Sequence, residues 1–301
     1  WIPIYEILVS RGFEVCLVNA RHLKNVPGRK SDILDCQWIQ QLHSYGLLRA
    51  SFRPPEDICA LRALAHHRDN LIRYRAAHIQ HMQKALQMMN VKLTMVVSDI
   101  TGVTGLSIIR AIVAGERDPH ELACLRQPGC AKTEEEIAKA LEGNYRAEHL
   151  FVLKQALAQY DFYLGQIEAC DTEMEGMYAD LPPCDPDEIG SPPPKPRSRK
   201  TRKNQTHFDL STSLYRVVGV DLTAIDGLDA LTVHSIITRI GTDVTSWPTV
   251  KHFTSWLCLS PNNDKSGGKV LRSRTQKTQN RANLAFRLAA QSLSRSDSAL
   301  G

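Results

Sequence analysis

Apolar residues recur at helical intervals over two long stretches of the chain. In the first, 57–91, they are Leu61, Leu64, Leu71, Ile72, Ile79, Met82, Leu86 and Met89. In the second, 146–178, they are Leu150, Leu153, Leu157, Tyr160, Leu164, Ile167 and Met174. The three- and four-residue spacing predicts two long helices with a coiled-coil seam, arranged as a helical hairpin or as a dimerisation arm. A plain helical-bundle core fits the same periodicity.

The first 50 residues alternate between helical and extended patterns. Ile2–Val9 predicts a helix, Arg11-Gly12 interrupts it, and Phe13–Val18 predicts a short buried strand. A polar loop through Pro27-Gly28 leads to Ser31, a candidate N-cap for a second helix. The apolar face expected for that helix contains Ile33, Trp38, Ile39 and Leu42. This order predicts part of an α/β unit.

Two stretches of the chain concentrate positive charge. Ser191–Lys203, within a linker at 182–206, holds four prolines, six basic residues and no acid. Such a segment suits either a polyanion or a solvated tether. The second stretch, 264–287, sets seven basic residues against Asp264 alone: Lys265, Lys269, Arg272, Arg274, Lys277, Arg281 and Arg287. This local excess is larger than the net charge of the whole chain, which is +5, and it predicts phosphate contact.

Composition narrows the class of protein. A chain of 301 residues with 43% hydrophobic residues is long enough for two or three domains. No apolar run reaches the roughly 18 residues of a membrane span, and no secretory signal opens the sequence. The eight cysteines include no CxxC pair and are expected to be reduced thiols. Because residue 1 is Trp and the first methionine is Met82, we expect a fragment of a longer chain.

Asp32 and Asp35 form the first chemical candidate. Carboxylates three residues apart at a helix start lie on one face, where Mg²⁺ would relieve their repulsion and add phosphate oxygens as further ligands. Asp near a helix N-terminus is also favoured by capping and by the helix dipole, without any metal.

The segment Arg216–Gly241 is the second candidate. A short helix, a glycine-containing turn and another helix resemble a helix-hairpin-helix unit, in which backbone N–H groups hold phosphate. An ordinary pair of antiparallel helices has the same pattern.

Ser266 is the third candidate, within Lys265-Ser266-Gly267-Gly268-Lys269. Glycines allow a phosphodiester to approach the backbone, and flanking lysines would stabilise anionic charge near the hydroxyl group. A serine nucleophile also needs a proton acceptor, and Asp264 is the nearest acid in the sequence. A flexible turn without catalytic function has the same composition.

All three of these segments resemble a known family. GRKSDILDCQWIQQLHSYGLL is similar to the Lys-Ser/Thr-Asp-x-x-Asp motif of the DEDD-type insertion-sequence transposases, relatives of the Piv and MooV invertases. LYRVVGVDLTAIDGLDALTVHSIITRIGTD and FTSWLCLSPNNDKSGGKVL resemble the C-terminal transposase domain of that family. The motifs occur in the family's order, on either side of the helical region and the basic linker.

The resemblance implies a fold of α/β plus mostly α class. Residues 1–52 would be part of a RuvC-like, RNase H-type domain, and 53–181 a coiled-coil insert. Residues 182–211 would be the basic proline-rich linker, and 212–301 a helical transposase domain with the helix-hairpin-helix-like unit.

The resemblance also implies a mechanism. An Asp, Glu, Asp, Asp quartet binds Mg²⁺, and its last two acids match Asp32 and Asp35. The serine that attacks the DNA backbone matches Ser266. Double-stranded DNA and an element-encoded guide RNA would be the partners, held by Lys195, Arg197, Arg199, Lys200, Arg202, Lys203, Lys265, Gly267, Gly268, Lys269, Arg272 and Arg274. Homodimers that assemble into tetramers would combine acids and serine from different protomers. The protein would act without a membrane, in the cytoplasm of a prokaryote and at its nucleoid.

The chain departs from the family pattern at its ends. The first Asp and the Glu of the quartet would precede Trp1, and the family continues beyond Gly301. We therefore expect this polypeptide to be truncated at both ends and not to cleave DNA. The alternatives to a recombinase are a metal-dependent RuvC-like junction nuclease, in which Ser266 is only part of a turn, and an inactive nucleic-acid-binding remnant.

Overall fold

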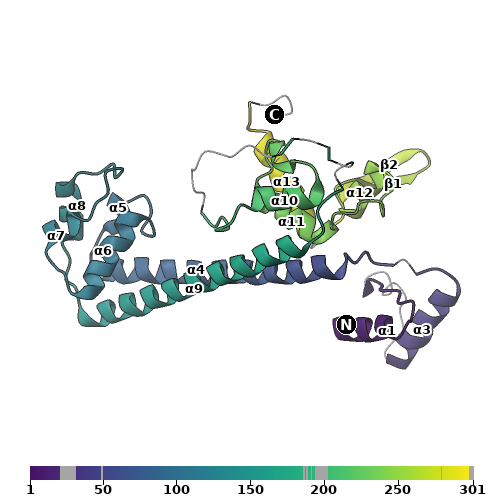
Figure 1. The fold of residues 1–301 in the computed structure, drawn as a ribbon, viewed down its shortest axis with the longest axis horizontal. Coiled ribbons are helices and arrows are strands. Elements are labelled where there is room, and N and C mark those ends of the chain that lie inside the picture. Colours follow the sequence, from purple (N-terminus) through teal and green to yellow (C-terminus); the bar gives the residue numbers. More distant parts are fainter. Residues whose placement is uncertain are drawn as a thin grey trace. The chain divides into compact units, whose positions relative to one another are not determined.

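The computed structural model describes residues 1–20, 32–48, 50–185, 187, 189–190, 192–193, 203–278 and 280–297, without the side chain of Asn262. Most of the described residues are helical, and a small two-stranded sheet accompanies the helices (Figure 1). The chain divides into two compact units, Trp1–Pro55 and Glu56–Gly301. The mostly α part of the expected α/β plus mostly α class is confirmed, whereas the α/β, RuvC-like and coiled-coil assignments remain predictions.

The first unit contains α1 (Ile2–Ser10) and α3 (Asp32–Ser44), at the places where the sequence predicts helices. The expected strand at Phe13–Val18 is wrong: in the described part of this unit, that segment makes only an isolated bridge between Val18 and Ala50. A strand needs a ladder that satisfies its backbone groups, and one bridged pair supplies little of it. No residue of α3 is buried, and Ile33 is 71% exposed.

In the second unit, α4 (Glu56–Met88) and α9 (Ala147–Asp180) pack along each other within one chain (Figure 1). Most of the side chains that the periodicity singled out are buried, in a seam to which other helices of this unit also contribute: Leu61, Leu71, Met82, Leu86, Leu153, Leu157, Tyr160, Ile167 and Met174. Because buried apolar area is the main stabilising contribution, this seam accounts for two helices of more than 30 residues.

The segment between the long helices folds into shorter helices: α5 (Leu93–Val96), α6 (Val103–Ala114), α7 (Pro119–Ala123) and α8 (Glu134–Leu141). Local signals set their ends. Gly115 ends α6 in the left-handed conformation, Asp118 caps α7, and Thr133 forms a capping box with Glu136 at the start of α8. Their apolar faces share a core with the adjacent ends of α4 and α9.

The C-terminal part contains the following elements in order: α10 (Leu210–Val218), the short 3₁₀ helix η2 (Leu222–Ala224), α11 (Ala230–Ile240), α12 (Val250–Trp256), β1 (Pro261–Ser266), β2 (Lys269–Thr275) and α13 (Arg281–Leu293). The helices α10 and α11 share a second core with α4 and α9. Behind α11, a third core joins α12 and α13. Arg281 at the start of α13 also forms an ion pair with Asp69 of α4 at 2.6 Å.

All eight cysteines are free thiols in the structure. Among the described residues, no helix is long and apolar enough to span a bilayer.

Candidate nucleophile and nucleic-acid interface

Asp32 and Asp35 lie in the first turn of α3, and both are exposed. Their spacing places both carboxylates on one side of the helix, where the helix dipole also favours them. Two carboxylates are donors that Mg²⁺ accepts, so these residues fit a partial magnesium site. Within the described residues, no group of three or more His, Cys, Asp or Glu side chains could hold a metal ion. Ser31 and Lys30 of the same motif lie outside the described residues.

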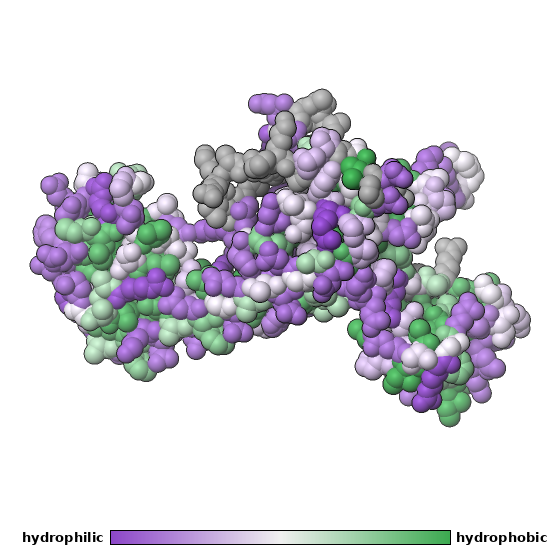
Figure 2. All heavy atoms as spheres, in the orientation of Figure 1, coloured by the Kyte–Doolittle hydropathy of each residue, from purple (hydrophilic) through white to green (hydrophobic). Residues whose placement is uncertain are grey.

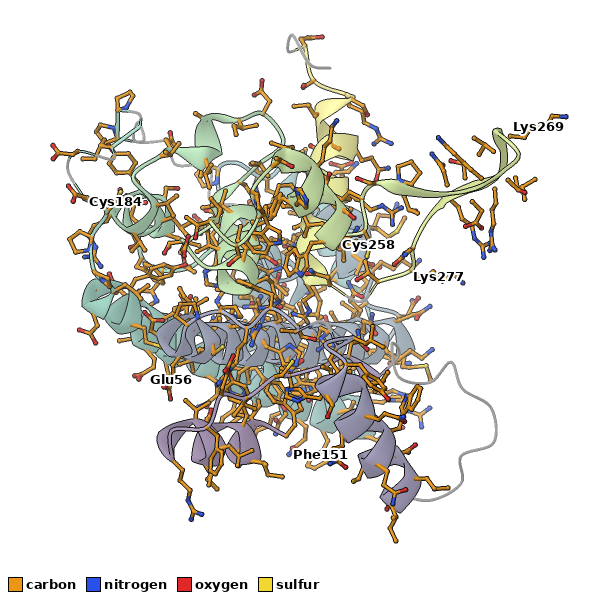
Figure 3. The ribbon with its side chains drawn as sticks, turned by 90° about the vertical axis from the view of Figure 1, so that its right-hand side faces the viewer. Glu56, Phe151, Cys184, Cys258, Lys269 and Lys277 are labelled. Atoms are coloured by element: carbon orange, nitrogen blue, oxygen red, sulfur yellow. The ribbon has the colours of Figure 1, made fainter. Side chains whose placement is uncertain are left out.

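The hairpin of β1 and β2 starts from a firmly packed base. Leu257 is fully buried in the third core, and its carbonyl oxygen accepts a buried hydrogen bond of 2.7 Å from Asn283 Nδ2 on α13. Trp247, Phe253 and Trp256 pack around this point, with ring centroids 4.8–6.3 Å apart. The base is therefore fixed by side-chain packing, while the hairpin itself extends away from it (Figure 3).

Ser266 is the last residue of β1, next to the turn of the hairpin. The turn consists of Gly267 and Gly268, with φ angles of 54° and 76°. Positive φ at both central positions is what a type I′ turn requires, and glycine adopts it without steric cost. A Cβ atom added at either glycine would meet nothing within 4 Å. Ser266 therefore lies at an open backbone turn that a bulky phosphodiester can approach.

The basic residues of the second charged stretch divide into two groups. Lys265, Lys269, Arg272, Arg274 and Lys277 are exposed on or beside the hairpin, and Figure 3 labels Lys269 near its tip and Lys277 near its base. On the face shown in Figure 2, the hairpin surface is mostly hydrophilic or intermediate. Arg281 and Arg287 lie on α13 instead, where Arg281 is held by Asp69, so most of the positive charge lies on or beside the hairpin.

Most of the linker cations lie outside the described residues. They are Lys195, Arg197, Arg199, Lys200 and Arg202. Lys203 is described, and its Nζ atom forms an ion pair of 2.6 Å with Asp99. Burial alone would raise the pKa of Asp99, but hydrogen bonds from Lys203 and Thr101 outweigh it and lower that pKa.

The helix-hairpin-helix candidate folds as two helices, α10 and α11, with η2 between them. Gly227 of the connection has φ of 85°, and a Cβ atom there would lie 2.6 Å from the carbonyl oxygen of Ala289 on α13. The N-terminus of α11 is capped by the Asp229 carboxylate, which accepts from the Thr232 N–H at 2.8 Å. The close approach of Gly227 to α13 and the Asp229 carboxylate at the N-terminus of α11 favour the ordinary pair of helices.

The structure thus forms two separate groups of candidates. The acids lie together on α3 in the first unit, and Ser266 lies with the exposed cations on the hairpin of the second unit. The sequence reasoning missed the hairpin itself. A Gly-Gly pair is a hairpin signal between two runs of β-branched and aromatic residues, and the polar run Pro261–Ser266 does not supply one of them.

Comparisons with known families match both parts of the chain. Residues 1–91 match the family model for DEDD transposases of the IS110 type, described as a transposase. Residues 221–300 match the model described as the transposase IS116/IS110/IS902 family. The chain belongs to the IS110 family of transposases. The two matches together span more than half of this transposase, and they contain Asp32 and Asp35 in the first and Ser266 in the second.

Membership of this family indicates that the transposase acts in DNA transposition and recombination, and that it binds DNA. Neither the comparison with curated proteins nor the comparison with solved structures returned a match.

Proposed function

We propose that this transposase is the recombinase of an insertion sequence, which cuts and rejoins double-stranded DNA with Ser266 as the nucleophile. The observation that carries the proposal is the position of Ser266. It ends β1 at a type I′ turn with open space beside both glycines, among exposed cations, inside the matched transposase segment.

The proposed step conserves the number of phosphate ester bonds. Ser266 Oγ loses its proton to solvent and forms a bond to phosphorus. The bond between phosphorus and an oxygen of the departing DNA strand breaks, and that oxygen takes up a proton. Since one ester replaces another, the strand can later be rejoined without ATP.

Asp32 and Asp35 would hold Mg²⁺ in this proposal, together with further acids of the family quartet. When bound, the ion would polarise a phosphate oxygen. The exposed carboxylates on α3 support this assignment because nothing in the described part of the first unit buries them. The two aspartates would in turn keep the ion on one side of the helix.

Partners follow from the same reasoning. The hairpin cations and the linker would contact phosphates of DNA and of an element-encoded guide RNA, whose base pairing would choose the site. Homodimers and tetramers would combine the acids of one protomer with the serine of another.

The experiment uses protein expressed from the complete reading frame, RNA transcribed from the same element, and labelled DNA of the element end. Wild-type protein is expected to form a covalent protein–DNA adduct that survives denaturation, and Ser266→Ala to form none. Ser273→Ala is the matched control on the opposite strand of the same hairpin and should retain the adduct.

The remaining outcomes contradict the proposal in distinct ways. If Ser266→Ala still cuts DNA and Asp35→Ala does not, the protein is a metal-dependent nuclease. Binding of DNA without cutting or adduct by the wild type indicates a binding module.

Mixing Ser266→Ala with Asp35→Ala protein tests the shared site, because only subunits that exchange acids and serine would regain the adduct.

A further inference from the structure

The pairing of β1 with β2 sorts the hairpin side chains onto two faces. Residues directly opposite each other in an antiparallel ladder point to the same face, with Cβ atoms about 4.5–5.5 Å apart. The pairs are Pro261–Thr275, Asn262–Arg274, Asn263–Ser273, Asp264–Arg272, Lys265–Val270 and Ser266–Lys269. Ser266 therefore shares its face with Lys269, while its neighbour in sequence, Lys265, lies on the other face with Val270.

A bulge changes which cations join Ser266. The register shifts between Asp264 and Lys265, so that Leu271 of β2 has no directly opposite residue. Simple alternation along β2 would place Lys269 on the face opposite to Arg272, because three positions separate them. The extra residue restores the phase, since a bulge inserts one residue into one strand without a partner.

The bulge thus gathers one chemical set on one face. Asp264 and Ser266 alternate onto it from β1, and their opposite residues Arg272 and Lys269 come from β2. Arg274 follows two residues after Arg272 on the same face. All three cations are exposed, and Asp264 is the one acid among them, so this face carries a net positive charge that reaches the serine.

We propose that Lys269 binds the phosphate that Ser266 attacks, and that Arg272 and Arg274 extend the contact along the adjoining DNA backbone. The proposal rests on the nucleophile assigned above and selects one of the two lysines that flank the turn. The ammonium group of Lys269 would face the non-bridging oxygens, whose negative charge increases as the serine oxygen adds to phosphorus. Lys269 keeps its proton throughout, so the step remains balanced as written.

Lysine footprinting tests the geometry without requiring catalysis. The wild-type protein, alone and bound to an element-end DNA duplex with its RNA, is treated with an acetylating reagent and analysed by mass spectrometry. Lys269 is expected to be protected in the complex, and Lys265 to remain reactive. Equal protection of both lysines, or stronger protection of Lys265, would overturn the proposal.

Adduct kinetics at saturating DNA test the role of Lys269. Lys269→Ala is expected to slow adduct formation about 10²-fold, the usual cost of removing one donor to a developing anion. Lys265→Ala should slow adduct formation at least about tenfold less than Lys269→Ala does, and Lys269→Arg should recover part of the rate. Lys251→Ala, at an exposed position of α12, is the control for a lost surface charge.

The two proposals fail differently. An adduct that forms in wild type and is lost in Ser266→Ala, with equal losses for Lys269→Ala and Lys265→Ala, leaves the nucleophile intact and refutes the face assignment. An adduct that persists in Ser266→Ala refutes the nucleophile, while the footprint still decides which face of the hairpin contacts phosphate.

Discussion

Arg68 of α4 and Asp171 of α9 form a buried ion pair between the two long helices, with side chains only 5% and 3% exposed. Arg68 Nη2 donates to Asp171 Oδ2 at 3.2 Å and to the carbonyl oxygens of Asn204 and Gln205 at 3.1 Å. Asp171 Oδ2 also accepts from the His207 N–H at 3.3 Å. The pair therefore joins the helical hairpin to the residues that lead into α10.

Removing one member of this pair should be strongly destabilising. Arg68→Ala leaves the Asp171 carboxylate buried without its partner, and we expect the free energy of unfolding to fall by about 3–5 kcal/mol. Urea unfolding followed by circular dichroism measures it. The matched control is Arg110→Ala, which breaks the exposed pair with Asp161 and should cost no more than about 1 kcal/mol. Similar losses in both variants would contradict the buried role of Arg68.

The buried His234 predicts a pH dependence of stability. Burial and the nearby Arg68 and Arg239 lower the pKa of His234 to about 3. The unfolded chain takes up a proton near the ordinary value of 6.5, whereas the folded chain does not. Stability is therefore full above pH 6.5 and declines as the pH falls toward 3. Between pH 6.5 and pH 5 the free energy of unfolding should fall by about 2 kcal/mol, at 1.36 kcal/mol for each pH unit.

Urea unfolding at pH 7.5 and pH 5 checks this dependence. His234→Asn keeps an acceptor for the hydroxyl group of Tyr178, which lies 2.7 Å from His234 Nδ1, but cannot take up a proton. The variant should lose about 2 kcal/mol less than wild type over this pH interval. An equal loss in the two proteins would assign the pH dependence to other groups.

The turn of the hairpin predicts a difference between two substitutions at one position. Gly267 has positive φ, which asparagine tolerates and valine does not. We expect Gly267→Val to form the DNA adduct at least about tenfold more slowly than Gly267→Asn, since such strain costs roughly 1–3 kcal/mol. Urea midpoints of both variants should agree, because the hairpin residues are exposed and contribute little to the cores. Equal adduct rates would show that the turn conformation does not matter to the reaction.

Two further glycines should respond to alanine in opposite directions. Gly227→Ala places a Cβ atom 2.6 Å from a backbone oxygen at positive φ, so it should destabilise the protein by at least about 1–3 kcal/mol. Gly165 lies inside α9 with open space around it, and Gly165→Ala should stabilise by about 0.5–1 kcal/mol. Thermal unfolding of both variants measures the difference. A neutral Gly227→Ala would show that α13 moves away at little cost.

The elements that depend on neighbouring residues could be predicted from the sequence. Helical periodicity located α4 and α9, because a helix brings residues three and four apart onto one side whatever surrounds it. The acids on α3 and the serine beside two glycines were found for the same reason: each motif lies within a few residues.

Tertiary structure decided everything that joins distant residues. The extended pattern of Phe13–Val18 could not reveal that it bridges only at Val18, because a strand exists through its partner. Likewise, Arg281 pairs with Asp69, more than two hundred residues away, rather than lying with the exposed cations of the hairpin. The sequence alone could not show on which face of the hairpin Lys269 lies. It depends on one unpaired residue, Leu271, in a ladder that only folding aligns.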